Sequence, residues 1–169
     1  AAFHASIPAA GADQPFGSPE AVLVPMLANF EAIRSRVRDE AILGRLAGLE
    51  NWTRSRHAQL TPVLSRRRGE GFVRECHGDM HRGNIALDGG EILIFDGIEF
   101  NPGLRWIDTQ SELAFLLMDL EEAGELGAAR RLLNRYLERT GDYAGLRVLD
   151  FYQVYRALVR AKVLAIRLS

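Results

Sequence analysis

The stretch that decides the fold is His77-Gly78-Asp79-Met80-His81-Arg82-Gly83-Asn84, and Asp96 follows it twelve residues later. An extended segment ends at Cys76 before this stretch, and residues 85–87 and 91–95 read as two short strands after it. Asp88-Gly89-Gly90 separates these strands, and glycine supplies the positive φ that a tight hairpin turn needs. The sequence therefore predicts a loop between two strands and then a β-hairpin that returns Asp96 to the side of the loop.

The side chains of this stretch are those that a phosphotransfer centre requires. In such a centre an Asp accepts the proton of the attacking hydroxyl, an Asn holds Mg²⁺, and an Asp after the next hairpin binds the metal that bridges the ATP phosphates. We therefore expect Asp79 to be the catalytic base, with Asn84 and Asp96 as ligands of Mg²⁺ and its nucleotide, because the interval from Asp79 to Asn84 matches that of a kinase catalytic loop. The simpler interpretation is that Asp79 and Asn84 only stabilise turns through nearby backbone N–H groups.

The pattern His-Gly-Asp-x-His-x-x-Asn resembles the catalytic loop of the aminoglycoside phosphotransferase/choline kinase family, which has a protein-kinase-like fold. Two further segments, residues 95–101 and 105–108, are similar to an uncharacterised bacterial subfamily, some members of which are fused to a P-loop kinase domain. The resemblance is close from Cys76 to Leu120. It implies an α+β, mainly helical fold: a kinase-like C-terminal lobe whose small β-hairpin sheet carries the catalytic loop, in a single domain over residues 1–169.

The resemblance also implies roles for residues around the loop. His77 would be structural and hold the loop through hydrogen bonds, whereas His81 would lie near the phosphate or brace the loop. Glu99 would lie near the metal or the substrate hydroxyl, although a plain surface carboxylate is the simpler interpretation.

Farther along, the resemblance implies supporting residues. Arg105 and Asp108 would either form an ion pair with each other or line the acceptor pocket. Glu112 stands where the family has an Asp that caps the backbone of the catalytic loop. Because Glu is one methylene longer, we expect either a helix that sits slightly back or a looser contact. Gly97 replaces a bulkier residue of the family, which predicts a more mobile metal loop.

Lysine is almost absent from the chain. Basic residues number 21, yet Lys162 is the one lysine among them. A kinase of this fold uses a lysine of its N-terminal lobe on the nucleotide phosphates. Lys162 lies in the last predicted helix, and no strand-rich segment precedes the first one. We therefore expect the C-terminal lobe alone, inactive without a missing N-terminal nucleotide-binding lobe that a longer protein would supply.

Bulk properties exclude some classes of partner. The net charge of −1 and pI of about 6.5 predict no attraction to nucleic acid or to a membrane surface. Cys76, the single cysteine, cannot form an internal disulfide and is expected to be a small buried hydrophobe. One cysteine, with no signal-like or 18-residue apolar stretch, predicts a cytoplasmic location.

Helices are predicted on both sides of the central loop. Ser18-Pro19-Glu20 has the composition of a helix start, and a second helix is expected from Asp39 to Arg68, with Pro25 and Pro62 as candidate kinks or breaks. A buried helix is expected over residues 106–120, and two more over residues 121–140 and 142–168.

For some residues the sequence predicts a structural or surface role rather than a functional one. His4 is expected to be a helix cap or exposed. The run Arg66-Arg67-Arg68 is expected to be a solvated helix C-terminus rather than an anion site. Aromatic residues of the last segment are expected in the core, namely Tyr143, Phe151, Tyr152 and Tyr155.

Three functions remain open from the sequence. The leading one is transfer of the γ-phosphate of ATP or GTP to the hydroxyl of a small molecule. The second is a non-catalytic kinase-like module for binding or regulation, which an upstream sequence without a phosphate-binding lysine would favour. The third is a zinc hydrolase built on His77, Asp79 and His81, which predicts zinc retained after purification.

Overall fold

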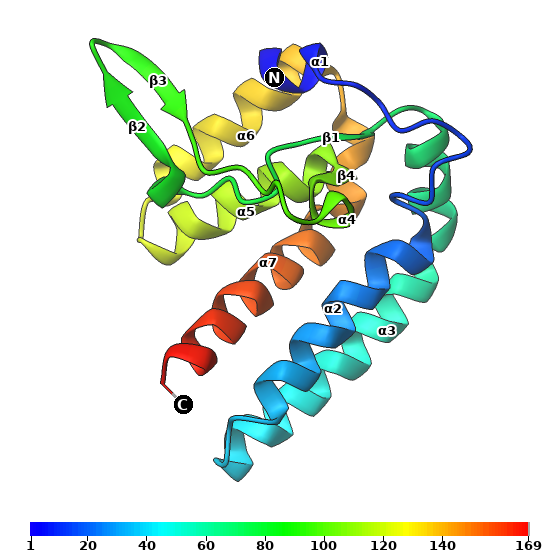
Figure 1. The fold of residues 1–169 in the computed structure, drawn as a ribbon, viewed down its shortest axis with the longest axis vertical. Coiled ribbons are helices and arrows are strands. Elements are labelled where there is room, and N and C mark those ends of the chain that lie inside the picture. Colours follow the sequence, from blue (N-terminus) through cyan, green and yellow to red (C-terminus); the bar gives the residue numbers. More distant parts are fainter. Residues whose placement is uncertain (169) are drawn as a thin grey trace.

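A computed structural model describes residues 1–168, and its architecture is α+β and mainly helical (Figure 1). The helices are α1 (Ala2–Ser6), α2 (Pro19–Arg34), α3 (Glu40–Gly69), α4 (Pro102–Arg105), α5 (Thr109–Glu122), α6 (Leu126–Thr140) and α7 (Leu146–Arg167). The strands are β1 (Val73–Glu75), β2 (Ile85–Asp88), β3 (Glu91–Ile94) and β4 (Trp106–Asp108), and 3₁₀ turns cover Arg82–Asn84 and Tyr143–Gly145. Within residues 1–168, the helices lack an apolar stretch of the length that a membrane-spanning segment needs.

The two long N-terminal helices begin where the sequence predicts. The Ser18 hydroxyl accepts a hydrogen bond from the Ala21 N–H, and the Asp39 carboxylate accepts one from the Ile42 N–H. Each side chain satisfies an N–H group that has no partner inside the helix. Pro25 does not displace the start of α2, and Pro62 does not end α3.

The core forms where α7 crosses α2, α3 and α5, with α6 packed on α5 (Figure 1). Its most buried members come from three helices and include Met26, Ala114 and Phe151, each with 0% exposure. Burying a large apolar side chain contributes about 1.5–3 kcal/mol, so this crossing is the main source of stability. The prediction that Phe151, Tyr152 and Tyr155 are core residues is confirmed. For Tyr143, which lies in a 3₁₀ turn and is 57% exposed, it is wrong.

Two small antiparallel sheets frame the central loop. β1 pairs with β4, Val73 facing Asp108 and Glu75 facing Trp106. β2 pairs with β3 in the predicted hairpin, and Gly89 and Gly90 both have positive φ at its turn. Figure 1 shows the hairpin projecting away from the helices at one corner of the molecule.

The predicted helix over residues 106–120 is wrong at its start. Trp106, Ile107 and Asp108 form β4, and α5 begins at Thr109 with Asp108 as its N-cap. The Asp108 carboxylate accepts a hydrogen bond from the Gln110 N–H. The apolar residues of this segment fit a strand as well as a helix, and pairing with β1 settles which one forms.

The expectation of a wholly solvated basic run at the end of α3 is also wrong. Arg66 is exposed, but the Arg67 side chain is 3% exposed and lies between two buried carboxylates. It donates two hydrogen bonds to Asp108 and two to Asp142, at 2.7–2.9 Å. Burial alone would lower the pKa of Arg67, but these hydrogen bonds and charges raise it above the ordinary value. Arg67 thus fastens the end of α3 to the start of α5 and to the turn before α7.

Candidate active site around Asp79

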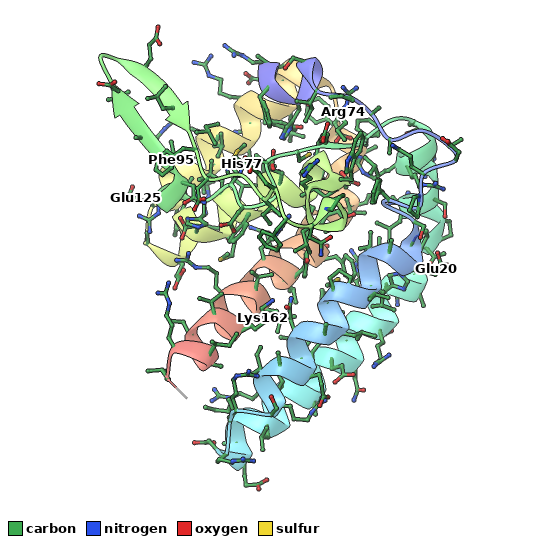
Figure 2. The ribbon with its side chains drawn as sticks, in the orientation of Figure 1. Glu20, Arg74, His77, Phe95, Glu125 and Lys162 are labelled. Carbon is green, nitrogen blue, oxygen red and sulfur yellow. The ribbon has the colours of Figure 1, made fainter. Side chains whose placement is uncertain are left out.

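Residues 76–84 connect β1 to β2, and glycine is required near the start of this connection. Gly78 has φ of +86°, and a Cβ there would lie 2.8 Å from the Leu104 carbonyl oxygen. Any other residue would be strained in conformation and would also clash with backbone. His77 precedes this turn, and Figure 2 shows it beside Phe95, where the chain returns from the hairpin.

Asn84 fixes the direction of Asp79. Its side-chain amide donates to the Asp79 main-chain oxygen at 3.0 Å and to Asp79 Oδ2 at 3.1 Å. Asn84 is 7% exposed, whereas the Asp79 side chain is 34% exposed. The carboxylate is therefore held from within the protein and faces solvent, and both amide hydrogen bonds leave the amide oxygen of Asn84 available for another ligand.

The two histidines bond to the loop itself. His77 Nε2 lies 2.8 Å from the Phe95 carbonyl oxygen, and its Nδ1 accepts from the Asp79 N–H at 3.3 Å. His81 Nδ1 accepts from the Gly83 N–H at 3.0 Å, and its Nε2 lies 3.5 Å from Asp79 Oδ2. A neutral imidazole with the proton on Nε2 satisfies the contacts of both rings. Since both His77 nitrogens face backbone groups, a zinc site on His77, Asp79 and His81 would require breaking these bonds.

Asp96 adopts a backbone conformation that L-residues rarely take. Its φ is +62°, and no other non-glycine residue in the described range has a positive φ. Such conformations cost about 1–3 kcal/mol and persist where the surrounding structure enforces them. Here His77 enforces it from both sides, because its main-chain oxygen accepts from the Ile98 N–H and its ring bonds to Phe95.

Asp79 and Asp96 line one open pocket of about 500 Å³, together with residues 97–100. Its charged lining consists of carboxylates, with Glu99 as the third, and the exposed Phe100 ring is its largest apolar side chain. Gly97 packs near the His77 ring, where a Cβ would lie 3.4 Å from His77 Cδ2. The sequence-predicted Asp79, Asp96 and Glu99 are thus brought to one pocket.

A buried network supports the loop from the side of α5. Glu112, with 0% exposure, accepts the Gly78 N–H at 2.8 Å, so the longer side chain makes the contact without loosening it. Its other oxygen lies 2.8 Å from His4 Nε2, and His4 Nδ1 lies 2.8 Å from the Tyr136 hydroxyl. The expectation of an exposed or capping His4 is therefore wrong, because α1 packs over Glu112. Burial raises the pKa of Tyr136 to about 12, so the phenol beside His4 Nδ1 keeps its proton at neutral pH.

Sequence reasoning missed Arg156, which supports the loop from α7. This residue is 4% exposed and donates to the Gly78 main-chain oxygen at 3.0 Å and to Ser111. Both the N–H and the carbonyl of Gly78 are thus bonded to buried charged side chains. The signal in the sequence is an arginine on the apolar face of the last helix, one residue after Tyr155 and four after Tyr152.

Arg105 and Asp108 do not form the ion pair that was one of their predicted roles. Arg105 pairs with Glu75 at 2.9 Å and donates to the Glu99 main-chain oxygen at 3.1 Å. Asp108 is occupied by Arg67. Arg105 therefore ties the segment after Asp96 to β1, a link between elements that spacing along the chain does not reveal.

His4, Cys76 and Glu112 form a buried trio whose ligand atoms lie within 4.8 Å of one another. Hydrogen bonds already occupy His4 and Glu112, and burial raises the pKa of the Cys76 thiol far above its ordinary value. We therefore interpret the trio as part of the support beneath the loop, with Cys76 as the buried residue that the sequence predicts.

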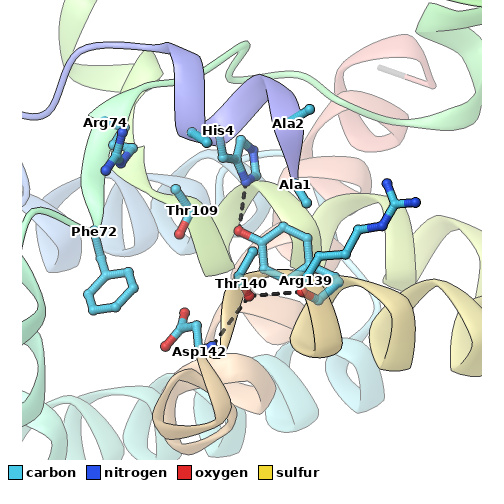
Figure 3. Close-up of a pocket in the computed structure, with 11 residues that line it drawn as sticks. Ala1, Ala2, His4, Phe72, Arg74, Thr109, Arg139, Thr140 and Asp142 are labelled. Atoms are coloured by element: carbon cyan, nitrogen blue, oxygen red, sulfur yellow. Dashed lines mark hydrogen bonds between the residues drawn. The ribbon is translucent and has the colours of Figure 1, made fainter.

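A second pocket, of about 510 Å³, lies between α1 and α6 (Figure 3). His4, Arg74, Thr109 and Arg139 are among its lining residues, and none of its lining residues belongs to the pocket at Asp79. His4 and Tyr136 of the support network line it, and no residue of the loop 77–84 does.

Comparison with known proteins finds relatives without a described function. The chain is 41% identical over 100 residues to uncharacterized proteins of Mycobacterium tuberculosis and Mycobacterium bovis. The match covers 59% of this chain and 20% of each relative, so the chain spans about a fifth of the length of the curated relatives it matches. No family model matches the chain. No solved structure matches it either.

Proposed function

We propose that this chain is the catalytic-loop lobe of a kinase-like phosphotransferase of the aminoglycoside phosphotransferase/choline kinase type. In a longer protein it would transfer the γ-phosphate of ATP or GTP to the hydroxyl of a small molecule. The observation that carries the proposal is the contact between Asn84 and Asp79, in a loop whose pocket also contains the strained Asp96.

The donor set fits Mg²⁺. This ion prefers oxygen ligands and is usually bound through one or two carboxylates together with substrate phosphates and water. Asp96 offers an exposed carboxylate, and Asn84 offers an amide oxygen whose orientation its own N–H groups fix. When bound, Mg²⁺ would neutralise charge on the phosphates. The carboxylates of the pocket do not form a compact trio within the described residues, so the remaining ligands of the ion would have to be nucleotide phosphates and water.

Asp79 would handle the proton of the acceptor. Its carboxylate would accept a hydrogen bond from the substrate hydroxyl and take its proton as the hydroxyl oxygen bonds to the γ-phosphorus. The bond from that phosphorus to the bridging oxygen would break, leaving the nucleoside diphosphate. His81 Nε2, at 3.5 Å, and the Asn84 amide would hold the carboxylate towards the acceptor. Positioning of this kind and electrostatic stabilisation together account for almost all of the catalysis in phosphoryl transfer.

The test uses a form of the protein extended to the length of its relatives. Asp79→Asn should lower kcat by about 10²–10⁴-fold with little change in nucleotide affinity, because the amide keeps the shape of the side chain but cannot take a proton. Asp96→Ala should abolish binding of the Mg²⁺-nucleotide itself. Asp88→Asn, which removes an exposed carboxylate at the hairpin turn, is the matched control and should behave as wild type. Turnover near the wild-type value in Asp79→Asn would defeat the proposal.

A non-catalytic kinase-like module is the second candidate, and one observation favours it. Lys162, the one lysine of the sequence, lies on α7 (Figure 2) and does not line the pocket at Asp79. A phosphate-binding lysine would therefore have to come from outside this chain. Mg²⁺-ATP and Mg²⁺-GTP should be titrated by calorimetry into this chain and into the extended form. Binding by the extended form alone supports the kinase, and absence of binding by both supports the module.

A further inference from the structure

A second carboxylate of α5 forms hydrogen bonds to the loop, at a point after Asp79. Asp119 lies about two helical turns after Glu112, so the two side chains lie on the same face of the helix. Asp119 is 2% exposed, and its Oδ2 accepts the Arg82 main-chain N–H at 2.8 Å and Arg82 Nε at 3.0 Å. Its other oxygen lies 3.3 Å from the guanidinium of Arg160 on α7.

These contacts lie on both sides of Asp79, the candidate base, along the chain. Glu112 accepts the N–H of Gly78, one residue before Asp79, and Asp119 accepts the N–H of Arg82, three residues after it. Both acceptors belong to one rigid helix, so the spacing of the two carboxylates sets the spacing of the two backbone groups. The loop between them cannot lengthen or shift without breaking one of these two hydrogen bonds.

The groups around Asp119 favour its ionised form although the side chain is buried. Burial alone would raise the pKa of its carboxyl, but the hydrogen bonds from Arg82 and the charges of Arg160 and Arg82 outweigh burial and lower it. Hydrogen bonds that involve an ionised partner are roughly twice as strong as those between neutral groups. The contact with the Arg82 backbone is therefore one of the firmer attachments of the loop.

The contact at Arg82 sets the position of the Asn84 side-chain amide, the proposed metal ligand. Arg82 begins the 3₁₀ turn Arg82–Asn84, in which the Asn84 N–H donates to the His81 main-chain oxygen at 3.0 Å. A turn fixed at Arg82 delivers the Asn84 side chain to Asp79. If Arg82 were released, Asn84 would lose its direction while Gly78 would stay attached to Glu112.

We propose that Asp119 is a positioning residue, the second of two carboxylates with which α5 clamps the catalytic loop on both sides of Asp79. Its effect on catalysis rests on the proposed function, whereas the clamp itself does not.

The first test measures amide hydrogen exchange by NMR in the 169-residue chain. In Asp119→Asn, which keeps an acceptor oxygen but loses the charge that strengthens the hydrogen bond, the protection of the Arg82 N–H should fall by about tenfold, while that of the Gly78 N–H should stay unchanged. Glu112→Gln should give the reverse pattern. Glu122→Gln is the matched control, because Glu122 lies on the same helix, 4.0 Å from Arg160, but is 58% exposed. It should change neither amide.

Two further variants keep the clamp testable if Asp119→Asn does not fold. Arg82→Gln removes the side-chain contact but keeps the backbone donor, so protection of the residue-82 amide should persist. Arg160→Gln removes the second cation that contacts Asp119. It should lower the protection of the Arg82 N–H less than Asp119→Asn does. Equal losses at residues 78 and 82 in any Asp119 variant would indicate general destabilisation and overturn the clamp. Unchanged protection at residue 82 in Asp119→Asn would also overturn it, as would loss of that protection in Arg82→Gln.

The second test uses the form of the protein extended to the length of its relatives, with ATP present, and reads out the metal ligand with Mn²⁺ as a paramagnetic probe. Broadening of the Asn84 side-chain amide should require several times more Mn²⁺ in Asp119→Asn than in wild type or Glu122→Gln. An unchanged Mn²⁺ dependence would overturn the link from Asp119 to Asn84. Absence of broadening in the wild type would instead refute the proposed metal site, and the exchange measurements would still decide the clamp.

Discussion

Replacing Arg67 with methionine should destabilise the protein more than almost any other single change. Arg67 donates four hydrogen bonds to Asp108 and Asp142, and the side chains of all three residues are 2–3% exposed. Arg67→Met would leave two buried carboxylates facing each other with no cation between them. Breaking a buried ion pair from one side costs about 3–5 kcal/mol.

The cost should be visible in urea and thermal unfolding of the 169-residue chain. For a domain of this size each kcal/mol lowers Tm by about 2–4 °C, so Arg67→Met should lower it by roughly 6–20 °C. Arg66→Met is the matched control, since Arg66 is the exposed neighbour on the same helix turn, and it should stay within about 0.5 kcal/mol of wild type.

A second variant separates charge from shape. Combining Arg67→Met with Asp108→Asn and Asp142→Asn removes all three charges but keeps oxygens that can accept from the Gln110 and Gly145 N–H groups. It should recover part of the lost stability. A loss of less than about 1 kcal/mol in Arg67→Met would place this cluster with exposed surface pairs and refute the reasoning.

Three more predictions concern the loop and its support. Gly78→Ala should lower the unfolding free energy by about 2 kcal/mol or more, because positive φ costs about 1–2 kcal/mol and the new Cβ would lie 2.8 Å from the Leu104 oxygen. Its urea unfolding should be compared with that of the exposed turn variant Gly90→Ala, and equal losses in the two variants would show that the clash adds nothing. Asp119, whose pKa is lowered from 3.8, stabilises the fold above about pH 4 and loses this effect as the pH falls; Asp119→Asn should therefore flatten the acid limb of the curve of stability against pH, and an unaltered limb would contradict the assignment. The Cys76 thiol, 4% exposed and with a raised pKa, should resist iodoacetamide at pH 8 in the native protein and react at once in urea; rapid native labelling would show that the strand is open.

The sequence predicted the local elements well because their signals are local. Ser18 and Asp39 start helices through caps, and Gly89 and Gly90 make the hairpin turn, all within a few residues. The sequence also predicted that Asp79, Asn84 and Asp96 lie together, on one loop and the hairpin that follows it. The structure adds that Asn84 bonds directly to Asp79, which spacing alone does not show.

Apart from Tyr143, the errors share a physical cause, which is pairing over long distances in the chain. His4 is buried because of Glu112 and Tyr136, more than a hundred residues away. Arg67 is buried because of two carboxylates that lie 41 and 75 residues farther along. In isolation each of these residues reads as a surface group. Arg156 and Asp119 were missed for the same reason.

The hairpin of β2 and β3 has a consequence for how the isolated chain behaves in solution. Leu87 and Ile92 are 74% and 70% exposed, Ile94 and Phe95 more than 40%, and β2 and β3 form a two-stranded sheet, so the outer edge of each strand pairs with no further strand of the described residues. An exposed apolar edge of this kind is a template on which further strands can add. The purified chain should therefore self-associate as its concentration rises, starting from residues 85–95, and a charged substitution such as Ile92→Lys should keep it monomeric.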